Sequence, residues 1–224
     1  MCDDAAMAES SPSEAPSDLG DRLAALGRSL GAREAQHADS LARAQACAES
    51  VREDVAAALG RVRGVPGRFE TVDAGQAFTV IVDYAHTPDG LEAVLVAARE
   101  ITDRTLTVVF GAGGDRDREK RPRMGEVARR LADRVVVTSD NPRGESPEAI
   151  MSGIVSGMDG APELLEPDRR RAIRHAIAGA REGDVVLIAG KGHETTQTIA
   201  DEVFDFDDRV VARDELRRLG GHAT

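Results

Sequence analysis

The sequence predicts an α/β fold, in which a Rossmann-like, mostly parallel sheet has helices on both faces. Two observations predict this fold. Four short runs of apolar, largely β-branched residues recur within residues 63–224, and segments with helical periodicity separate them. Runs that are apolar at nearly every position are typical of strands buried on both faces, because helices cover both faces of a parallel sheet.

The first 62 residues differ in composition from the rest of the chain. Residues 1–16 are rich in Ser, Ala, Pro, Asp and Glu, so they bury too little apolar surface to offset the entropy of ordering. The turn cluster Gly64-Val65-Pro66-Gly67 marks the start of the next unit. We therefore expect a disordered tail (1–16), a short helical segment (17–62) and an α/β domain (63–224).

The helical segment carries two apolar stripes. The first consists of Leu19, Leu23, Leu26 and Leu30. Gly31 follows it as a stop, and a second stripe runs from Leu41 to Leu59. This pattern predicts two amphipathic helices, which could form a hairpin. The stripes either pack on the following domain or form a seam with a second copy or a partner protein.

In the α/β domain, strands and helices alternate along the chain. Strands are predicted at 78–83, 106–110, 135–138 and 185–189. Helices are predicted at 88–99, 120–132, 147–157, 168–181 and 209–219.

Each predicted strand runs into a polar or glycine-rich segment. These segments are Asp83-Tyr84-Ala85-His86, Gly111-Ala112-Gly113-Gly114-Asp115-Arg116, Ser139-Asp140-Asn141-Pro142-Arg143 and Gly190-Lys191-Gly192-His193-Glu194. The carboxyl ends of parallel strands meet at one edge of the sheet, where open α/β folds bind ligands. We therefore expect a binding site at this edge.

The residue types at this edge suit a zwitterion. Arg116 can hold a carboxylate in bidentate geometry, and Asn141 and Arg143 flank a proline that stiffens their turn. Glu194 and backbone carbonyls suit an ammonium, and Gly190 allows close approach of the backbone. The sequence therefore predicts a site for an amino acid or a peptide.

The sequence assigns no catalytic residue and no metal ligand. No serine lies in a nucleophile elbow, so a hydrolase triad has no support. Asp115 and Asp117 could bind a metal, but Arg116 lies between them and Arg118 beside them, which disfavours a cation.

Composition excludes several other classes of protein. A net charge of −11, no Trp and a single Tyr argue against a nucleic-acid partner. No apolar run of about 18 residues occurs, and the acidic start differs from a signal peptide. Cys2 and Cys47, the only cysteines, predict no disulfide framework. We expect a cytoplasmic protein without a membrane partner.

Several motifs in register resemble the Mur ligase family, and within it the type that adds diaminopimelate. They are Gly64-Val-Pro-Gly-Arg-Phe-Glu70, Val82-Asp-Tyr-Ala-His-Thr-Pro-Asp89, Gly111 to Met124, Asp140-Asn-Pro-Arg143, Gly190-Lys-Gly-His-Glu194 and Phe206-Asp-Asp-Arg209. The resemblance covers about two-thirds of the chain. It implies the C-terminal domain of a ligase that makes peptidoglycan precursors.

The resemblance also implies roles for individual residues. Those expected to bind a meso-diaminopimelate-like substrate are Arg116, Asp140, Asn141, Arg143, Gly190 and Glu194. Arg68 and Asp83 match positions that reach the ribose and phosphates of ATP, and His86 lies next to that nucleotide edge. The family reaction uses ATP and Mg²⁺ to activate a carboxylate as an acyl phosphate, which the amine of diaminopimelate then attacks.

The chain departs from the family in its nucleotide machinery. No G-x-x-x-x-G-K-[ST] motif occurs, so the phosphate and Mg²⁺ site of the family is expected to be absent, and residues 17–62 resemble the end of the central domain. We expect the isolated chain to be inactive alone. Three hypotheses remain: half of a split ligase completed by a separate protein carrying the N-terminal and central domains, a non-catalytic diaminopimelate- or peptide-binding module, or an idle remnant.

Overall fold

The computed structural model describes residues 19–59 and 64–221. The chain divides into two units, Met1–Arg63 and Gly64–Thr224, which are described separately. The tail expected over residues 1–16 lies outside the described residues. Among the described residues, no helix combines the length and the apolar character that a membrane span requires.

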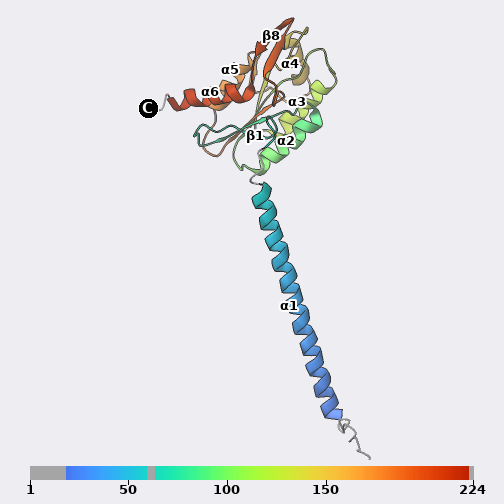
Figure 1. The fold of residues 1–224 in the computed structure, drawn as a ribbon. Coiled ribbons are helices and arrows are strands. Elements are labelled where there is room, and N and C mark those ends of the chain that lie inside the picture. The colour runs from blue at the N-terminus through green and yellow to red at the C-terminus, as the bar shows by residue number, and fades with distance from the viewer. Residues whose placement is uncertain (1–18, 60–63, 222–224) are drawn as a thin grey trace, which may run out of the picture. The chain divides into compact units, whose positions relative to one another are not determined.

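The described residues of the first unit form one helix, α1 (Leu19–Leu59), of 41 residues (Figure 1). The prediction of two helices with a stop at Gly31 is therefore wrong. A glycine inside a helix costs only about 1 kcal/mol relative to alanine, and the Ala, Arg, Glu and Gln residues around Gly31 favour helix strongly enough to continue through it. The leucines of the first stripe are 52–70% exposed. What covers the stripes stays a prediction.

The second unit is an α/β fold around a six-stranded sheet, as predicted (Figure 1). Its strands are β1 (Glu70–Thr71), β2 (Thr79–Asp83), β3 (Leu106–Phe110), β4 (Arg134–Thr138), β5 (Leu164–Glu166), β6 (Val185–Ala189), β7 (Thr196–Ile199) and β8 (Glu202–Asp205). Its helices are α2 (Pro88–Glu100), α3 (Lys120–Leu131), α4 (Pro147–Val155), α5 (Arg169–Ala178) and α6 (Asp208–Gly221). The sheet order is β1-β2-β6-β3-β4-β5, and β7 pairs with β8 in a separate hairpin.

Five of the six strands run parallel, and only β1 is antiparallel to its neighbour. The strand β6 enters between β2 and β3, with Ile81 opposite Leu187 on one side and Val108 opposite Leu187 on the other. All five residues of β3 and all five of β6 are buried. The near-continuous apolar runs of the sequence therefore correspond to the central strands, which helices cover on both faces.

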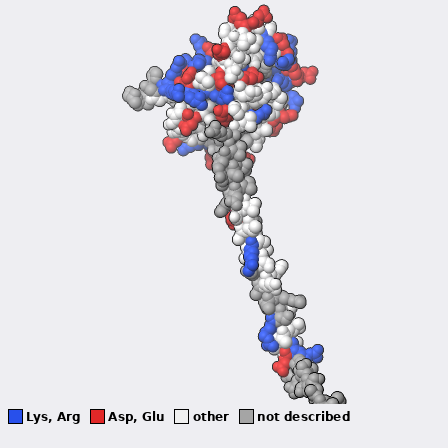
Figure 2. Space-filling model, in the orientation of Figure 1, with Lys and Arg blue, Asp and Glu red and all other residues white. Residues whose placement is uncertain are grey.

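Two apolar clusters fill the space between the sheet and its helices. Alternate residues along each strand point to opposite faces, so Ile81 packs with α2, α3 and α4, whereas Val80 and Val82 pack with α5 and α6. Charged side chains of both signs are interspersed on the face of the unit that Figure 2 shows.

Four short strands were not predicted from the sequence. Strands β1 and β5 have two and three residues, too few for a period to be detected. The β7–β8 hairpin exposes even its apolar residues, and every residue of β8 is exposed, so it lacks the alternation of a half-buried strand. This hairpin matters for the site, because the backbone of β7 contacts the segment after β4.

Candidate functional site

The four segments that carry unusual residues come together at one edge of the sheet. The strands β2, β6, β3 and β4 are consecutive neighbours and run parallel, so the segments that follow them lie along the same carboxyl edge. The sequence predicted this arrangement from the rule for open α/β sheets.

All six residues predicted to bind the amino acid line one cavity of about 450 Å³, which we call the edge cavity. Its lining consists of Tyr84, His86, Thr87, Gly113, Arg116, Asp117, Lys120, Asp140, Asn141, Arg143, Gly190 and Glu194. Residues from four segments, separated by up to 110 positions in the sequence, therefore line a single cavity.

Glycines allow the loops of this cavity to approach each other closely. A Cβ atom at Gly114 would lie 1.8 Å from the carbonyl oxygen of Pro142. Gly190 has a φ of +122°, and a Cβ atom there would lie 2.8 Å from Oδ2 of Asp140. A side chain at either position would displace backbone or a binding group, so both positions require glycine.

Arg143 is held in a specific conformation by the hairpin. Its φ is +50°, in the left-handed region that is unfavourable for a residue with a Cβ atom. Its backbone N–H donates to the carbonyl of Thr198 (3.1 Å), and its carbonyl accepts from the N–H of Ala200 (2.7 Å). Its Nη1 donates to the carbonyl of Gly114 (2.8 Å), so the rest of the guanidinium remains available toward the cavity.

Asn141 and Glu194 contact each other beside a buried lysine. Nδ2 of Asn141 donates to Oε2 of Glu194 (2.9 Å). Oδ1 of Asn141 accepts from the backbone N–H of Thr198 (3.0 Å) and from Nζ of Lys191 (3.1 Å). Lys191 is 0% exposed and does not line the cavity itself, although it contacts two residues that do.

Asp140 places a buried carboxylate at the cavity. Among the described residues, none donates a hydrogen bond to this carboxylate, and its closest cation is Nζ of Lys191 at 3.9 Å. Burial raises the pKa of the Asp140 carboxyl above its ordinary value, and the nearby Glu194 and Asp208 act in the same direction. A buried carboxylate without a donor is the group that a ligand's ammonium would satisfy.

Two cations face the same cavity from the loop after β3. Arg116 is exposed and has no hydrogen bond or ion pair to other described residues. Nζ of Lys120 donates to the carbonyl of His86 (2.8 Å), and burial lowers the pKa of Lys120. The lining of the cavity therefore combines three cationic side chains with three carboxylates, namely Arg116, Lys120 and Arg143 with Asp117, Asp140 and Glu194.

A buried ion pair lies beneath the edge cavity. Nε and Nη2 of Arg169 donate to Oδ1 and Oδ2 of Asp208 at 2.8 and 2.7 Å, and both side chains are 0% exposed. The same guanidinium donates to the carbonyls of Ser139 (3.2 Å) and Ala189 (3.0 Å). Arg169 thus connects the ends of β4 and β6 to the first residue of α6.

The loop after β3 is also held by Glu145. Its carboxylate accepts from both terminal nitrogens of Arg121 (3.1 and 2.8 Å) and from the backbone N–H of Asp115 (2.7 Å). These contacts lower the pKa of Glu145 from 4.5 to about 2, and the hydrogen bonds from Arg121 make the largest contribution.

This pKa predicts an acid-sensitive loop. Because the folded pKa lies below the ordinary one, the stabilisation by ionised Glu145 is present above about pH 4.5 and is lost as the pH falls toward 2. We expect Glu145→Gln to remove part of the fall in melting temperature between pH 5 and pH 2.5. Replacing Glu148, whose carboxylate contacts only Ser146 and its own backbone N–H, should leave most of that fall in place. An equal fall in parent and Glu145→Gln would contradict the prediction.

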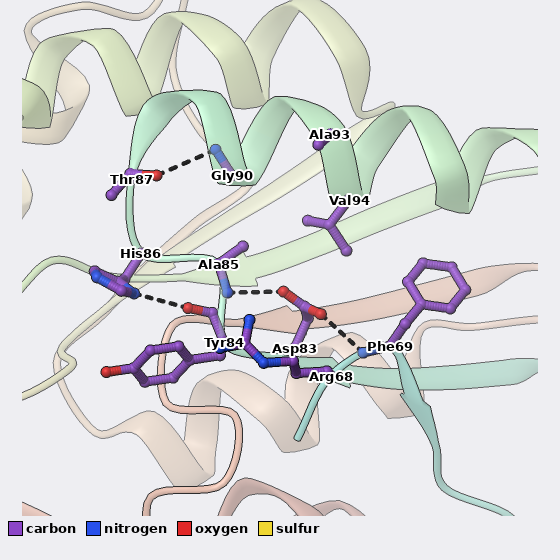
Figure 3. A pocket seen from close by; sticks show the side chains of 10 residues that line it. All are labelled: Arg68, Phe69, Asp83, Tyr84, Ala85, His86, Thr87, Gly90, Ala93 and Val94. Atoms are coloured by element: carbon purple, nitrogen blue, oxygen red, sulfur yellow. Dashed lines mark hydrogen bonds between the residues drawn. The ribbon is translucent and has the colours of Figure 1, made fainter. Parts of the chain in front are cut away.

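The three residues predicted to face the nucleotide line a second cavity, of about 460 Å³, which we call the side cavity (Figure 3). Tyr84, His86 and Thr87 line both cavities, so the two adjoin. Thr87 caps the start of α2, since its hydroxyl accepts from the N–H of Gly90 (3.1 Å).

Asp83 connects two loops at the side cavity. Its carboxylate oxygens accept from the N–H groups of Phe69 and Ala85, each at 2.8 Å (Figure 3). Arg68 lies over the ring of Tyr84, 5.6 Å from its centroid, and Nδ1 of His86 contacts the carbonyl of Tyr84 at 2.8 Å. Each Asp83 oxygen keeps a lone pair for a hydroxyl donor, and the Arg68 guanidinium has capacity for an anion.

These groups fit part of a nucleotide but not its metal. A carboxylate and an arginine suit a ribose and a phosphate. Among the described residues, no group of three or more His, Cys, Asp or Glu side chains is placed to hold a metal ion. The side chains at the side cavity therefore suit a nucleotide without supplying a Mg²⁺ site.

Sequence reasoning missed Lys191, Arg169 and Asp208, which lie beneath the site. One signal could have found the first. The chain has 29 basic residues but only two lysines, Lys120 and Lys191. Both lie at the edge cavity, one lining it and one contacting its lining. Arg169 and Asp208 are 39 positions apart, and nothing in the sequence pairs them.

Comparison with known proteins finds matches to the α/β unit. The family model for "Mur ligase, glutamate ligase domain" matches residues 67–192. The chain is 59% identical over 166 residues to the UDP-N-acetylmuramoyl-L-alanyl-D-glutamate–2,6-diaminopimelate ligase of Syntrophomonas wolfei, a match that covers 73% of this chain and 34% of that protein. For the ligase of the same name from Geobacillus kaustophilus, identity is 54% over 184 residues, covering 80% and 38%.

A solved structure of a UDP-N-acetylmuramoyl-L-alanyl-D-glutamate–2,6-diaminopimelate ligase is similar in both sequence and fold. It is 42% identical, with a TM-score of 0.66, and the match covers 71% of this chain and 33% of that one. The chain thus spans about a third of the length of the curated relatives it matches.

Proposed function

The chain belongs to the Mur ligase family through its glutamate ligase domain, and on this basis we propose that the α/β unit is the amino-acid-binding portion of an ATP-dependent acid–amino acid ligase. Its substrate is a meso-diaminopimelate-like amino acid, and its pathway is the synthesis of peptidoglycan precursors or a related one. Relatives that are 54–59% identical are ligases for 2,6-diaminopimelate, which supports this substrate class.

One observation carries the proposal: the edge cavity is lined by both carboxylates and guanidinium groups, which together match a zwitterion. Asp140 and Glu194 supply carboxylates for an ammonium, and Gly190 allows the ligand to approach the backbone. Arg116 and Arg143 supply guanidinium groups for a carboxylate. A diamino-dicarboxylic acid carries an ammonium and a carboxylate at each end. One end can therefore bind both the carboxylates and the guanidinium groups of the cavity, while the other end extends away from it.

In the ligase reaction this arrangement orients the incoming amine. The groups that bind the distal end of the amino acid fix its position without touching the reacting atoms. The free amine at the other end then points to where an activated carboxylate would lie. The described residues of this chain therefore contribute binding and orientation, and none is assigned a proton-transfer step.

The side cavity takes the nucleotide in this proposal. Arg68 and Asp83 would hold the phosphate and ribose edges of ATP, and His86 lies between that cavity and the edge cavity. ATP supplies the phosphoryl group that activates the acceptor carboxylate. The 224 residues contain no P-loop motif, so we propose that a P-loop domain outside them, on the same or a separate polypeptide, completes the site for the triphosphate and Mg²⁺.

Calorimetry with meso-diaminopimelate tests the substrate. Nη1 of Arg143 already donates to the carbonyl of Gly114, so the guanidinium has capacity for one charge-assisted contact with the ligand. We expect Arg143→Ala to remove this contact and to weaken binding by about tenfold. Arg104, at the opposite end of the strands, provides a matched control. Arg104→Ala should bind like the parent.

Two results would contradict the proposal. Absence of binding to the parent would remove the substrate assignment. Equal binding by parent and Arg143→Ala would place the ligand elsewhere. Binding without amide formation when a P-loop Mur fragment, the acceptor acid UDP-N-acetylmuramoyl-L-alanyl-D-glutamate, ATP and Mg²⁺ are added would instead favour a non-catalytic binding module.

A further inference from the structure

Lys191 is a fully buried cation beneath the edge cavity. Its Nζ atom donates to Oδ1 of Asn141 (3.1 Å) and to Oε2 of Glu194 (3.3 Å), and it lies 3.9 Å from Oδ1 of Asp140. All three partners line the cavity, whereas Lys191 has no exposed surface. Lys191 therefore acts on a ligand only through these partners.

The contacts of Lys191 leave one orientation for the Asn141 amide. The ammonium of Lys191 and the backbone N–H of Thr198 can only donate, so the oxygen of the amide has to face them. Nδ2 then points to Glu194, with one N–H bonded to Oε2 and the second available. Asn141 thus offers the cavity a donor and no acceptor.

The same contacts give the two oxygens of the Glu194 carboxylate different roles. Oε2 accepts from both Asn141 and Lys191, whereas no described residue donates to Oε1. Glu194 therefore offers a single acceptor at a fixed position. A ligand at this wall meets an N–H from Asn141 beside a carboxylate oxygen from Glu194.

We propose that Lys191 is a positioning residue that sets the polarity of this wall, so that the cavity selects an ammonium next to a carboxylate over an ammonium alone. The inference rests on the proposed function and adds its specificity determinant. The Asn141 N–H would receive the distal carboxylate of a diamino-dicarboxylic acid, and Oε1 of Glu194 its distal ammonium. An amino acid that lacks the distal carboxylate would use only the second contact.

The charges around Lys191 support this role. Asp140, Glu194 and Asp208 bring three carboxylates close to the cations of Arg169 and Lys191. With Lys191 present, one negative charge remains for the ligand's ammonium. Without it, the wall attracts any ammonium more strongly, and the Asn141 amide loses one of the two donors that hold its oxygen away from the cavity, so it is held less firmly for a carboxylate. Selectivity, rather than affinity for amines, is the property that Lys191 supplies.

The test compares three probes: meso-diaminopimelate, LL-diaminopimelate and L-lysine, which lacks the distal carboxylate. In Lys191→Met, we expect affinity for the meso isomer to fall by about tenfold while affinity for L-lysine stays equal or rises. The meso/L-lysine ratio then falls by at least about tenfold. A purely structural defect would instead weaken all three probes in the same proportion.

A second variant and a control keep the result interpretable. Lys191→Gln keeps an N–H donor without the charge. Its ratio of affinities for meso-diaminopimelate and L-lysine should therefore lie between those of the parent and Lys191→Met. This variant replaces Lys191→Met in the test if Lys191→Met does not fold. Arg181→Met, at the opposite end of the sheet, should match the parent for every probe. An unchanged ratio in folded Lys191→Met or Lys191→Gln would overturn the proposal.

A ligand-free measurement separates this inference from the proposed function. In ¹⁵N spectra of the unliganded chain, the Asn141 side-chain amide should give one pair of signals that shifts in Lys191→Met. Unchanged signals would overturn the role of Lys191 even if the amino acids bind. If the parent binds none of the three probes, the substrate assignment fails, and the amide signals still decide whether Lys191 orients Asn141.

Discussion

Replacement of Arg169 by Met should lower the free energy of unfolding by about 3–5 kcal/mol, the usual cost of leaving a buried charge without its partner. Asp208 is 0% exposed and would lose both of its bonds to the guanidinium. The carbonyls of Ser139 and Ala189 would lose a donor as well. Domains typically have only about 5–15 kcal/mol of stability, so the variant should unfold at much lower urea concentration.

The neighbouring Arg171 is a suitable control for this experiment. It lies on the same helix but is 69% exposed and pairs loosely with Asp168 at 3.7 Å. Arg171→Met should change stability by at most about 1 kcal/mol. The double change Arg169→Met with Asp208→Leu should recover part of the loss, because no charge is then left unpaired. Equal urea midpoints for Arg169→Met and Arg171→Met would refute the prediction.

Asp140→Asn should affect stability and ligand binding in opposite directions. Burial raises the pKa of Asp140, so ionisation costs the folded state free energy once the pH exceeds the ordinary value of about 4. The amide removes that cost, and the melting temperature at neutral pH should rise. Loss of the carboxylate should weaken binding of a diamino acid by about a hundredfold, or about 2.8 kcal/mol.

The pH dependence gives a further measure of Asp140. The parent should lose stability relative to Asp140→Asn as the pH rises from about 3 to 7, because only the parent has a carboxyl to ionise at this buried position. Asp73 is an exposed carboxylate in a loop before β2, and Asp73→Asn should not reproduce the effect on binding. A variant at Asp140 that is both less stable and fully able to bind would contradict both parts.

The sheet was predictable because its central strands are apolar at nearly every position. Periodicity placed β3 and β6 at their observed bounds, and the parallel arrangement then brought four segments to one edge. Gly31 was misjudged because a single glycine is a weak stop among strong helix formers. The β7–β8 hairpin was missed because its residues are held by backbone contacts with Arg143 rather than by a buried face.

The residues that line the site were more predictable than the buried residues beneath it. Arg116, Asn141, Arg143 and Glu194 follow strand ends, so their neighbours in space could be inferred from strand order. The residues beneath them depend on pairs far apart in the chain, such as Lys191 with Asn141, 50 positions away. Only packing in three dimensions brings such pairs together, and periodicity carries no information about it.

The position of β6 has a consequence for the order in which the α/β unit forms. This strand is the last of the parallel strands to be synthesised, yet it lies between β2 and β3. A nascent chain that has reached β5 has no partner for the inner edges of β2 and β3, and such unpaired edges invite aggregation. When Val185–Ala189 leaves the ribosome, the insertion joins both halves of the sheet and delivers Gly190, Lys191 and Glu194 to the edge cavity. Ribosome-bound chains that end before Val185 should therefore stay sensitive to protease, and those that expose β6 should become resistant in a single step.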